Sequence, residues 1–134
     1  MELLACRKAL GSKHPDTLIS VHNLGSLLRD QGKLGEAEPL HRVALEARRD
    51  TLGSTHPDTL SSVHNLARLL QDQSKLGEAE QLLREALAGR CSALGPAHPD
   101  TRTSFSALLY LLTAQGKARE ARELRAQYVS SDGR

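Results

Sequence analysis

The four residues His14-Pro15-Asp16-Thr17 are the clearest indication of the fold, because they return twice at one spacing. They recur as His56-Pro57-Asp58-Thr59 and as His98-Pro99-Asp100-Thr101, a step of 42 residues from 14 to 56 and again from 56 to 98. A second block, Gln31 to Glu38, returns in step as Gln73 to Glu80 and then fades. A fixed period in this range indicates a stack of copies of one supersecondary unit.

Within each unit the apolar residues recur with helical spacing. A first stripe contains Leu18, Val21, Leu24, Gly25 and Leu28, and it is matched 42 residues later by Leu60, Val63, Leu66, Ala67 and Leu70. A second stripe contains Ala37, Leu40, Ala44, Leu45 and Leu52, and it is matched by Ala79, Leu82, Leu83, Ala86, Leu87 and Leu94. Each unit is therefore predicted to be two antiparallel helices, A and B. The expected fold is all-α, an α-solenoid of stacked helix pairs with about seven helices.

Helix-boundary residues support the same division. Pro15, Pro57 and Pro99 suit the first position of helix A, where a missing N–H costs nothing. The aspartates that follow them place negative charge at the positive end of that helix. Glycines at 11, 53 and 95 come after each helix B, where a left-handed cap favours glycine. The stretch Gln31-Gly32-Lys33 and its copies form the turn from A to B.

These boundaries divide residues 1–134 into a single repeat domain. A half repeat with helix B only is expected over 1–13, full repeats over 14–55 and 56–97, a C-terminal capping repeat over 98–129, and a tail over 130–134. The opening half repeat has two explanations, a piece cut from a longer array or a natural end that packs on a partner. The last helix B is polar, with Arg122 and Arg125 on it, as suits a repeat on which nothing stacks.

Composition excludes several classes of protein. The 14.6 kDa chain has a formal net charge of +2 with both signs interspersed, which argues against a nucleic-acid partner. No apolar run approaches the ~18 residues of a membrane span, so membrane insertion is not expected. Cys6 and Cys91 have no metal-ligand spacing and lie about two repeats apart. Two free thiols favour a reducing compartment and an intracellular, cytoplasmic location.

The repeated residues resemble the tetratricopeptide repeat (TPR), whose pattern is a large residue, Leu-Gly, a large residue, Ala and an aromatic. The first copy of that pattern is Val21, Leu24-Gly25, Leu28, Ala37 and His41. The second is Val63, Leu66-Ala67, Leu70, Ala79 and Leu83, and the third is Phe105, Leu108-Leu109, Leu112, Ala121 and Arg125. The lengthened unit is similar to the repeats of kinesin light chain and nephrocystin-3. The resemblance implies a right-handed superhelix.

The resemblance also implies a binding surface on the concave, helix-A side of the array. Its expected lining is His22, Asn23, Ser26, Arg29, His64, Asn65, Arg68, Gln71 and Tyr110, with Ile19, Ser61, Thr103, Ser106 and Thr113 beside them. In repeats of the kinesin light chain type, the Asn of "Asn-Leu-Ala" holds the backbone of an extended peptide, which here would be the role of Asn23 and Asn65. The third repeat has Ala107 at this place. Capture of a C-terminal carboxylate through groove lysines is disfavoured, since this lining has no Lys.

Other residues have simpler structural interpretations. Three copies of His-Pro-Asp at repeat boundaries indicate a structural cap. His22 and His64 lack a convincing third ligand for a metal site. Arg48, Arg49 and Asp50 are interpreted as a solvated helix end, and His41 as a partly buried packing histidine.

No catalytic triad, phosphate loop or carboxylate pair is present, so neither an enzyme nor a cofactor is expected.

Three functions remain open at this point. The first is a non-catalytic scaffold that binds a peptide or protein segment on its concave helix-A face. The second is a structural subunit of a larger complex, docked through its open N-terminal end or its convex face, because the missing first helix A leaves Leu3 and Leu4 uncovered. The third is a repeat that self-associates by covering its open end with another copy.

Overall fold

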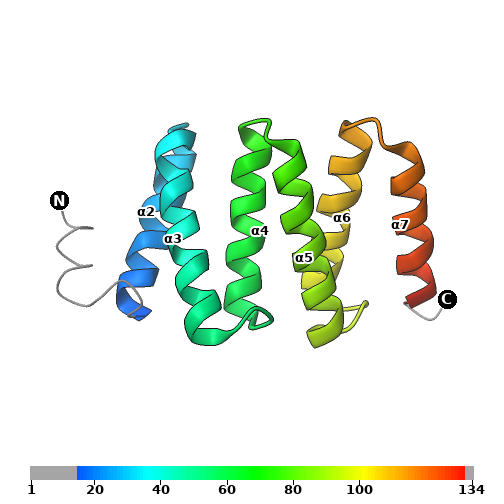
Figure 1. The fold of residues 1–134 in the computed structure, drawn as a ribbon, viewed down its shortest axis with the longest axis horizontal. Helices are drawn as coiled ribbons and strands as arrows, with labels where there is room; N and C mark the ends of the chain where they lie inside the picture. Colours follow the sequence, from blue (N-terminus) through cyan, green and yellow to red (C-terminus); the bar gives the residue numbers. More distant parts are fainter. Residues whose placement is uncertain (1–14, 132–134) are drawn as a thin grey trace.

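The computed structural model describes residues 15–131, which form helices joined by short turns and contain no strand. The helices are α2 (Pro15–Asp30), α3 (Leu34–Leu52), α4 (Pro57–Asp72), α5 (Leu76–Leu94), α6 (Pro99–Ala114) and α7 (Ala118–Ser131). They follow one another along the long axis of the molecule as three hairpins (Figure 1). The all-α solenoid is therefore confirmed, while the half repeat expected over 1–13 lies outside the described residues.

One hydrophobic core runs from α3 to α7. It joins Leu45 of α3 to Val63, Leu66, Ala67 and Leu70 of α4, to Ala79, Leu83 and Ala86 of α5, to Leu108, Leu111 and Leu112 of α6, and to Ala121 and Leu124 of α7. Alanines bring the paired helices close together, because Ala67, Ala79 and Ala86 are each 0% exposed. Gly89 makes another close approach, since a Cβ there would lie 2.8 Å from a methyl carbon of Leu60.

The His-Pro-Asp-Thr motif caps helix A. His56 and His98 are the N-cap residues of α4 and α6, and the proline that follows each is the first residue of the helix. The Nδ1 atoms of the two histidines accept hydrogen bonds from the backbone N–H groups of Asp58 and Asp100, both at 3.1 Å. The predicted structural cap is confirmed for the second and third motifs, while His14 lies outside the described residues.

The turns between helices use positive backbone φ angles. Gly32 and Gly116 have φ of +80° and +75° in the turns from A to B, and Ser74 takes the same place in the middle repeat with φ of +64°. Gly53 and Gly95, which follow each helix B, both have φ of +89°. Each donates its N–H to the carbonyl four residues earlier, on Arg49 and Cys91. Glycine suits these positions because a Cβ is strained at positive φ.

The predicted solvated helix end holds for Asp50, which is exposed, but Arg48 and Arg49 are half-buried and bond across to other helices. Arg48 donates hydrogen bonds to the backbone oxygen of Asp58 (3.3 Å) and to Oγ of Ser62 (2.7 Å), both on the next repeat. Arg49 pairs with Glu85 at 2.7 Å. A long side chain at this helix end reaches across the joint between repeats, which sequence periodicity within one helix does not reveal. Leu52 also departs from its predicted core stripe, being 41% exposed.

Both hydrogen bonds of Arg48 recur 42 residues later, at Arg90. Arg90 donates to the backbone oxygen of Asp100 (3.1 Å) and to Oγ of Ser104 (2.9 Å). It is only 7% exposed. Helices α3 and α5 are thus each fastened to the N-terminal end of the following helix A by one arginine, a contact called the arginine joint below.

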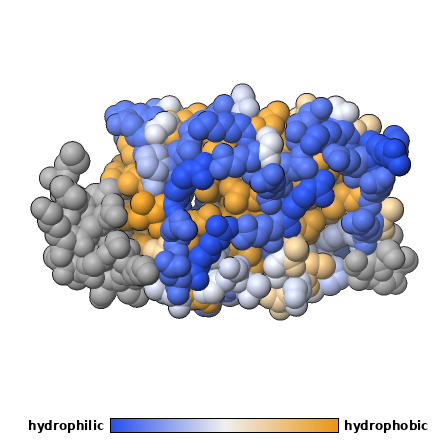
Figure 2. All heavy atoms as spheres, in the orientation of Figure 1, coloured by the Kyte–Doolittle hydropathy of each residue, from blue (hydrophilic) through white to orange (hydrophobic). Residues whose placement is uncertain are grey.

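Glutamate–lysine pairs form a second repeated contact between units. Glu38 accepts from Lys75 at 2.9 Å, and Glu80 accepts from Lys117 at 2.8 Å. Burial is the largest influence on the pKa of Glu80 and raises it. Hydrogen bonds from Lys117, Arg84 and Gln115 together outweigh that effect and hold the pKa at about 2. Hydrophilic side chains accordingly cross the front face over α3 and α5, with hydrophobic atoms showing between them (Figure 2).

Candidate functional site

The exposed side of α2, α4 and α6 is called the helix-A face here. On α2, Asn23 is exposed, while Ser26 and Arg29 are partly buried. On α4, Arg68 is exposed, while Asn65 and Gln71 are partly buried. Exposed neighbours are Ile19, Ser61, Thr103, Ser106, Tyr110 and Thr113. The helix-A face is therefore mainly neutral and polar, with exposed apolar surface at Ile19 (52%) and Tyr110 (67%).

The two asparagines occupy equivalent places 42 residues apart, on α2 and α4. Within the part of the chain that the structure describes, neither carboxamide takes part in a side-chain hydrogen bond. Asparagine is intrinsically poor in the middle of a helix. Two uncommitted carboxamides at repeated positions on one surface are available to bind a ligand.

The two arginines of the helix-A face, Arg29 and Arg68, differ in whether they already form an ion pair. Arg29 donates to Asp72 at 2.9 Å, an ion pair between α2 and α4. Arg68 is exposed and forms no ion pair among the described residues. Arg68 is thus the better placed of the two to meet an acidic group on a partner.

His22 and His64 are more buried than the predicted lining of a binding surface would be. His64 is 9% exposed, and its Nδ1 is buried without a hydrogen-bond partner among the described atoms, as is Nδ1 of His22. Burial, then the charges of Arg90 and Arg68, lower the pKa of His64 to about 4. Burial and the charge of Arg48 also lower the pKa of His22. Both rings are therefore neutral at pH 7.

His41 packs against α2 as a packing histidine, and it is buried rather than partly buried as predicted. It is 3% exposed, and its ring meets that of His22 edge-on at a centroid separation of 5.7 Å. A Cβ at Gly25 would come within 3.0 Å of its ring. Burial is the main reason that the pKa of His41 is lowered to about 4. No group of three or more potential metal ligands occurs in the described residues.

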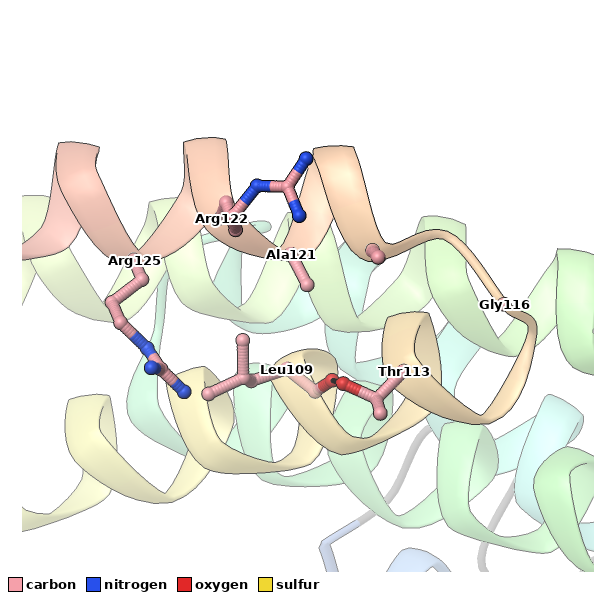
Figure 3. Close-up of a pocket in the computed structure, with 7 residues that line it drawn as sticks. Leu109, Thr113, Gly116, Ala121, Arg122 and Arg125 are labelled. Atoms are coloured by element: carbon pink, nitrogen blue, oxygen red, sulfur yellow. Dashed lines mark hydrogen bonds between the residues drawn. The ribbon is translucent and has the colours of Figure 1, made fainter.

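A hollow of about 200 Å³ lies between α6 and α7, and sequence reasoning did not predict it. Its wall is formed by Leu109, Thr113, Gly116, Ala118, Ala121, Arg122 and Arg125. Figure 3 shows Arg125 extending from α7 toward Leu109 of α6, with Arg122 one turn away on the same helix. The available signal was the change from Glu38 and Glu80 to Arg122 at one repeat position.

Two further findings concern helix hydrophobicity and cysteine. None of the described helices is long and apolar enough to cross a membrane. Cys91 has a free thiol, whereas Cys6 lies outside the described residues.

Comparison with known proteins identifies the repeats. A tetratricopeptide repeat family model matches residues 2–50 and 18–92. No curated protein matches. Among solved structures, kinesin light chain TPR-like repeats from Podosopora anserina superpose with a TM-score of 0.87 at 34% identity, covering 96% of this chain and 61% of that one. A single-residue variant of that same protein gives 0.87 at 33% identity, with 96% and 60% covered.

A more distant match is BtubC (BKLC) from P. vanneervenii, with a TM-score of 0.82 at 20% identity, which supports the fold alone. That match covers 96% of this chain and 51% of the other. The chain thus spans less than two thirds of the length of these solved structures. Tetratricopeptide repeats are generally non-catalytic scaffolds that bind proteins or peptides. The repeat length, helix pairing, family match and structural similarity together show that this chain belongs to the tetratricopeptide repeat family, with repeats of the kinesin light chain type.

Proposed function

We propose that the helix-A face binds an extended segment of another protein. The observation that supports this most is the pair of uncommitted carboxamides on Asn23 and Asn65. A carboxamide both donates and accepts hydrogen bonds, so it matches a peptide unit whatever the side chain. Because Ala107 takes this position in the third repeat, the carboxamide contacts extend over two repeats.

Neighbouring side chains supply the remaining contacts in this proposal. Arg68 offers a positive charge, and Tyr110 and Ile19 offer apolar surface beyond either asparagine. His22, His64, Ser26, Arg29 and Gln71 are partly or largely buried and shape the floor of the face. Binding of this kind requires no cofactor or metal and performs no reaction. The free thiol of Cys91 agrees with a reducing, cytoplasmic location.

The test uses a peptide selected from a random library against the full chain. The double variant Asn23→Ala/Asn65→Ala should bind this peptide about tenfold more weakly or worse, because each lost hydrogen bond is worth about 0.5–1.5 kcal/mol. Titration calorimetry measures the affinity, and circular dichroism checks that helix content is unchanged. The matched control is Gln81→Ala, which removes an exposed carboxamide from α5. Equal losses in the two variants, or no loss in the double variant, would contradict the proposal.

A second candidate function rests on a different observation. Leu27 of α2 is 53% exposed, whereas Leu69 and Leu111, its equivalents in the next two repeats, are both 0% exposed. We infer that this outer face of α2 docks the protein into a larger complex as a structural subunit. Cross-linking within the native complex distinguishes the two functions. Cross-links from Lys33, at the end of that face, support the second function, while cross-links confined to the helix-A face exclude it.

A further inference from the structure

The hollow between α6 and α7 is an apolar depression with two arginines at its edge. Leu109 is partly buried, Ala121 is 8% exposed and Ala118 is exposed. Arg122 and Arg125 are exposed, and neither forms an ion pair among the described residues. Figure 3 shows the Arg122 guanidinium near Ala121 and the Arg125 guanidinium beside Leu109. This surface is called the end hollow below.

The equivalent surface one repeat earlier shows which kind of element covers residues at these positions. One repeat earlier, the counterparts of Leu109, Ala121 and Arg125 are Ala67, Ala79 and Leu83. All three counterparts are 0% exposed. They belong to the same core cluster as Leu108, Leu111 and Leu112 of α6, the first helix of the following repeat. The corresponding surface inside the array is therefore covered by a helix.

The charge of the end hollow is the reverse of that inside the array. At the two earlier equivalents of Arg122, Glu38 and Glu80 each accept a hydrogen bond from a lysine of the following repeat, Lys75 or Lys117. Arg122 repels a lysine in that place and attracts a carboxylate. The covering helix thus needs an acidic group where these repeats carry lysine.

A second copy of this chain does not meet that requirement. Among the described residues, the element that a copy stacked head to tail would present first is α2, followed by the turn after it. The residue equivalent to Lys75 and Lys117 in that turn is Lys33, which would face Arg122 with like charge. Arg125, in place of the fully buried Leu83, would add a second unpaired cation to the same contact.

We propose that the end hollow binds an acidic amphipathic helix of another protein. The apolar stripe of that helix covers Leu109 and Ala121. A carboxylate at the end of the helix pairs with Arg122, and a second acidic group pairs with Arg125. This surface lies on α6 and α7, the last described helices, and shares only Thr113 with the helix-A face, so either binding function stands if the other fails.

Two synthetic peptides test the proposal, both built on the α6 sequence from Pro99 to Lys117. One keeps the natural sequence, and the other carries Lys117→Glu, which puts a carboxylate opposite Arg122. We expect the acidic peptide to bind the full chain about tenfold more tightly at low ionic strength, since one repulsion becomes one attraction. Fluorescence anisotropy of the labelled peptides gives both affinities. Both peptides bear the same cost of helix formation, so this cost cancels in the ratio.

The decisive variant is Arg122→Glu, which should reverse the order of the two peptides. Arg119→Glu is the matched control, since it makes the same change of charge on the same helix at a side chain that is 86% exposed and outside the hollow. It should leave the tenfold ratio in place. Circular dichroism confirms that both variants keep their helices. Absence of binding by both peptides, or a ratio that Arg122→Glu leaves unchanged, overturns the proposal.

Discussion

At the scale of single residues, equivalent positions in the three repeats act as internal controls for one another. Gly32, Ser74 and Gly116 occupy the same turn, and all three have positive φ. Only the serine carries a Cβ in that conformation. A Cβ in the left-handed region costs roughly 1–2 kcal/mol, so the middle turn stores strain that its two neighbours lack.

Ser74→Gly should therefore stabilise the array. The released strain is offset in part by the greater freedom of glycine in the unfolded chain, leaving a net gain of about 0.5–1 kcal/mol. Urea unfolding followed by circular dichroism measures it. The reverse change in the equivalent turn, Gly116→Ser, should destabilise by a similar amount. A loss of stability in the Ser74→Gly variant would mean that the serine side chain makes a contact that outweighs the strain.

The buried histidines should make stability depend on pH. The pKa values of His41 and His64 are each lowered to about 4, first by burial. The unfolded chain, with histidine pKa near 6.5, binds more protons between the two values. Stability is thus full above about pH 6.5 and falls as the pH drops toward 4, by up to about 3 kcal/mol for each histidine.

Urea unfolding at several pH values between 7 and 4 checks this dependence. The charged groups that act on His64 are Arg90, Arg68 and Asp100, and only Asp100 favours its protonation. His64→Gln removes that titration and should flatten the curve. Parallel curves for the parent and His64→Gln would show that His64 does not control the loss.

At the scale of helices, each described arginine joint depends on one cation, which is half-buried at Arg48 and buried at Arg90. Arg90 is 7% exposed and bonds both a backbone oxygen at the start of α6 and Oγ of Ser104. Burial is the main influence on the pKa of Arg90 and lowers it, yet an arginine stays charged in proteins. The bonds at the joint compensate for desolvation, and they fix how α6 sits against α5.

Arg90→Ala should cost about 2 kcal/mol, because hydrogen bonds of charged groups contribute roughly 1.5–3 kcal/mol and Ser104 would lose its partner. Arg84→Ala on the same helix is the control. Its pair with Glu80 is partly exposed, with 44% of the arginine side chain accessible, so it should cost less than about 1 kcal/mol. Chemical denaturation of both variants gives the comparison. Equal costs would mean that the arginine joint contributes no more than a surface pair.

At the scale of the whole molecule, stability depends on close contact between successive helices. Ala79 is 0% exposed and belongs to the core cluster that extends from α3 to α7. The same cluster ends at Ala121 and Leu124, beyond which the end hollow begins. A change at the centre of this cluster therefore affects both sides of the array.

Ala79→Glu should unfold the array or open it at α5, since it adds volume and an unpaired charge to a packed site, at a cost above about 4 kcal/mol. Ala88→Glu, at an exposed position on α5, is the matched control and should change stability by less than about 0.5 kcal/mol. Thermal unfolding monitored by circular dichroism measures both. A melting temperature for Ala79→Glu equal to that of the parent would mean that the packing of α4 against α5 is wrong.

The sequence by itself determined the repeat length, the helix pairs, their caps and the glycine turns. These features depend on contacts within a few residues, which spacing and residue type encode directly. It also predicts that Asn23 and Asn65 share one surface, which stays a prediction. Spacing within one helix did not reveal that Arg48 and Arg90 cross to the next repeat, because that contact joins residues on different hairpins.

Which of several equivalent residues are covered became clear from the packing of the helices. Leu27, Leu69 and Leu111 have the same identity and the same place in the repeat, yet Leu27 is 53% exposed and the other two are 0% exposed. Likewise, Arg122 lies at the edge of the end hollow, while the equivalent Glu80 is paired with Lys117. Burial in a stack depends on what lies next to a repeat, and a local pattern does not carry that information.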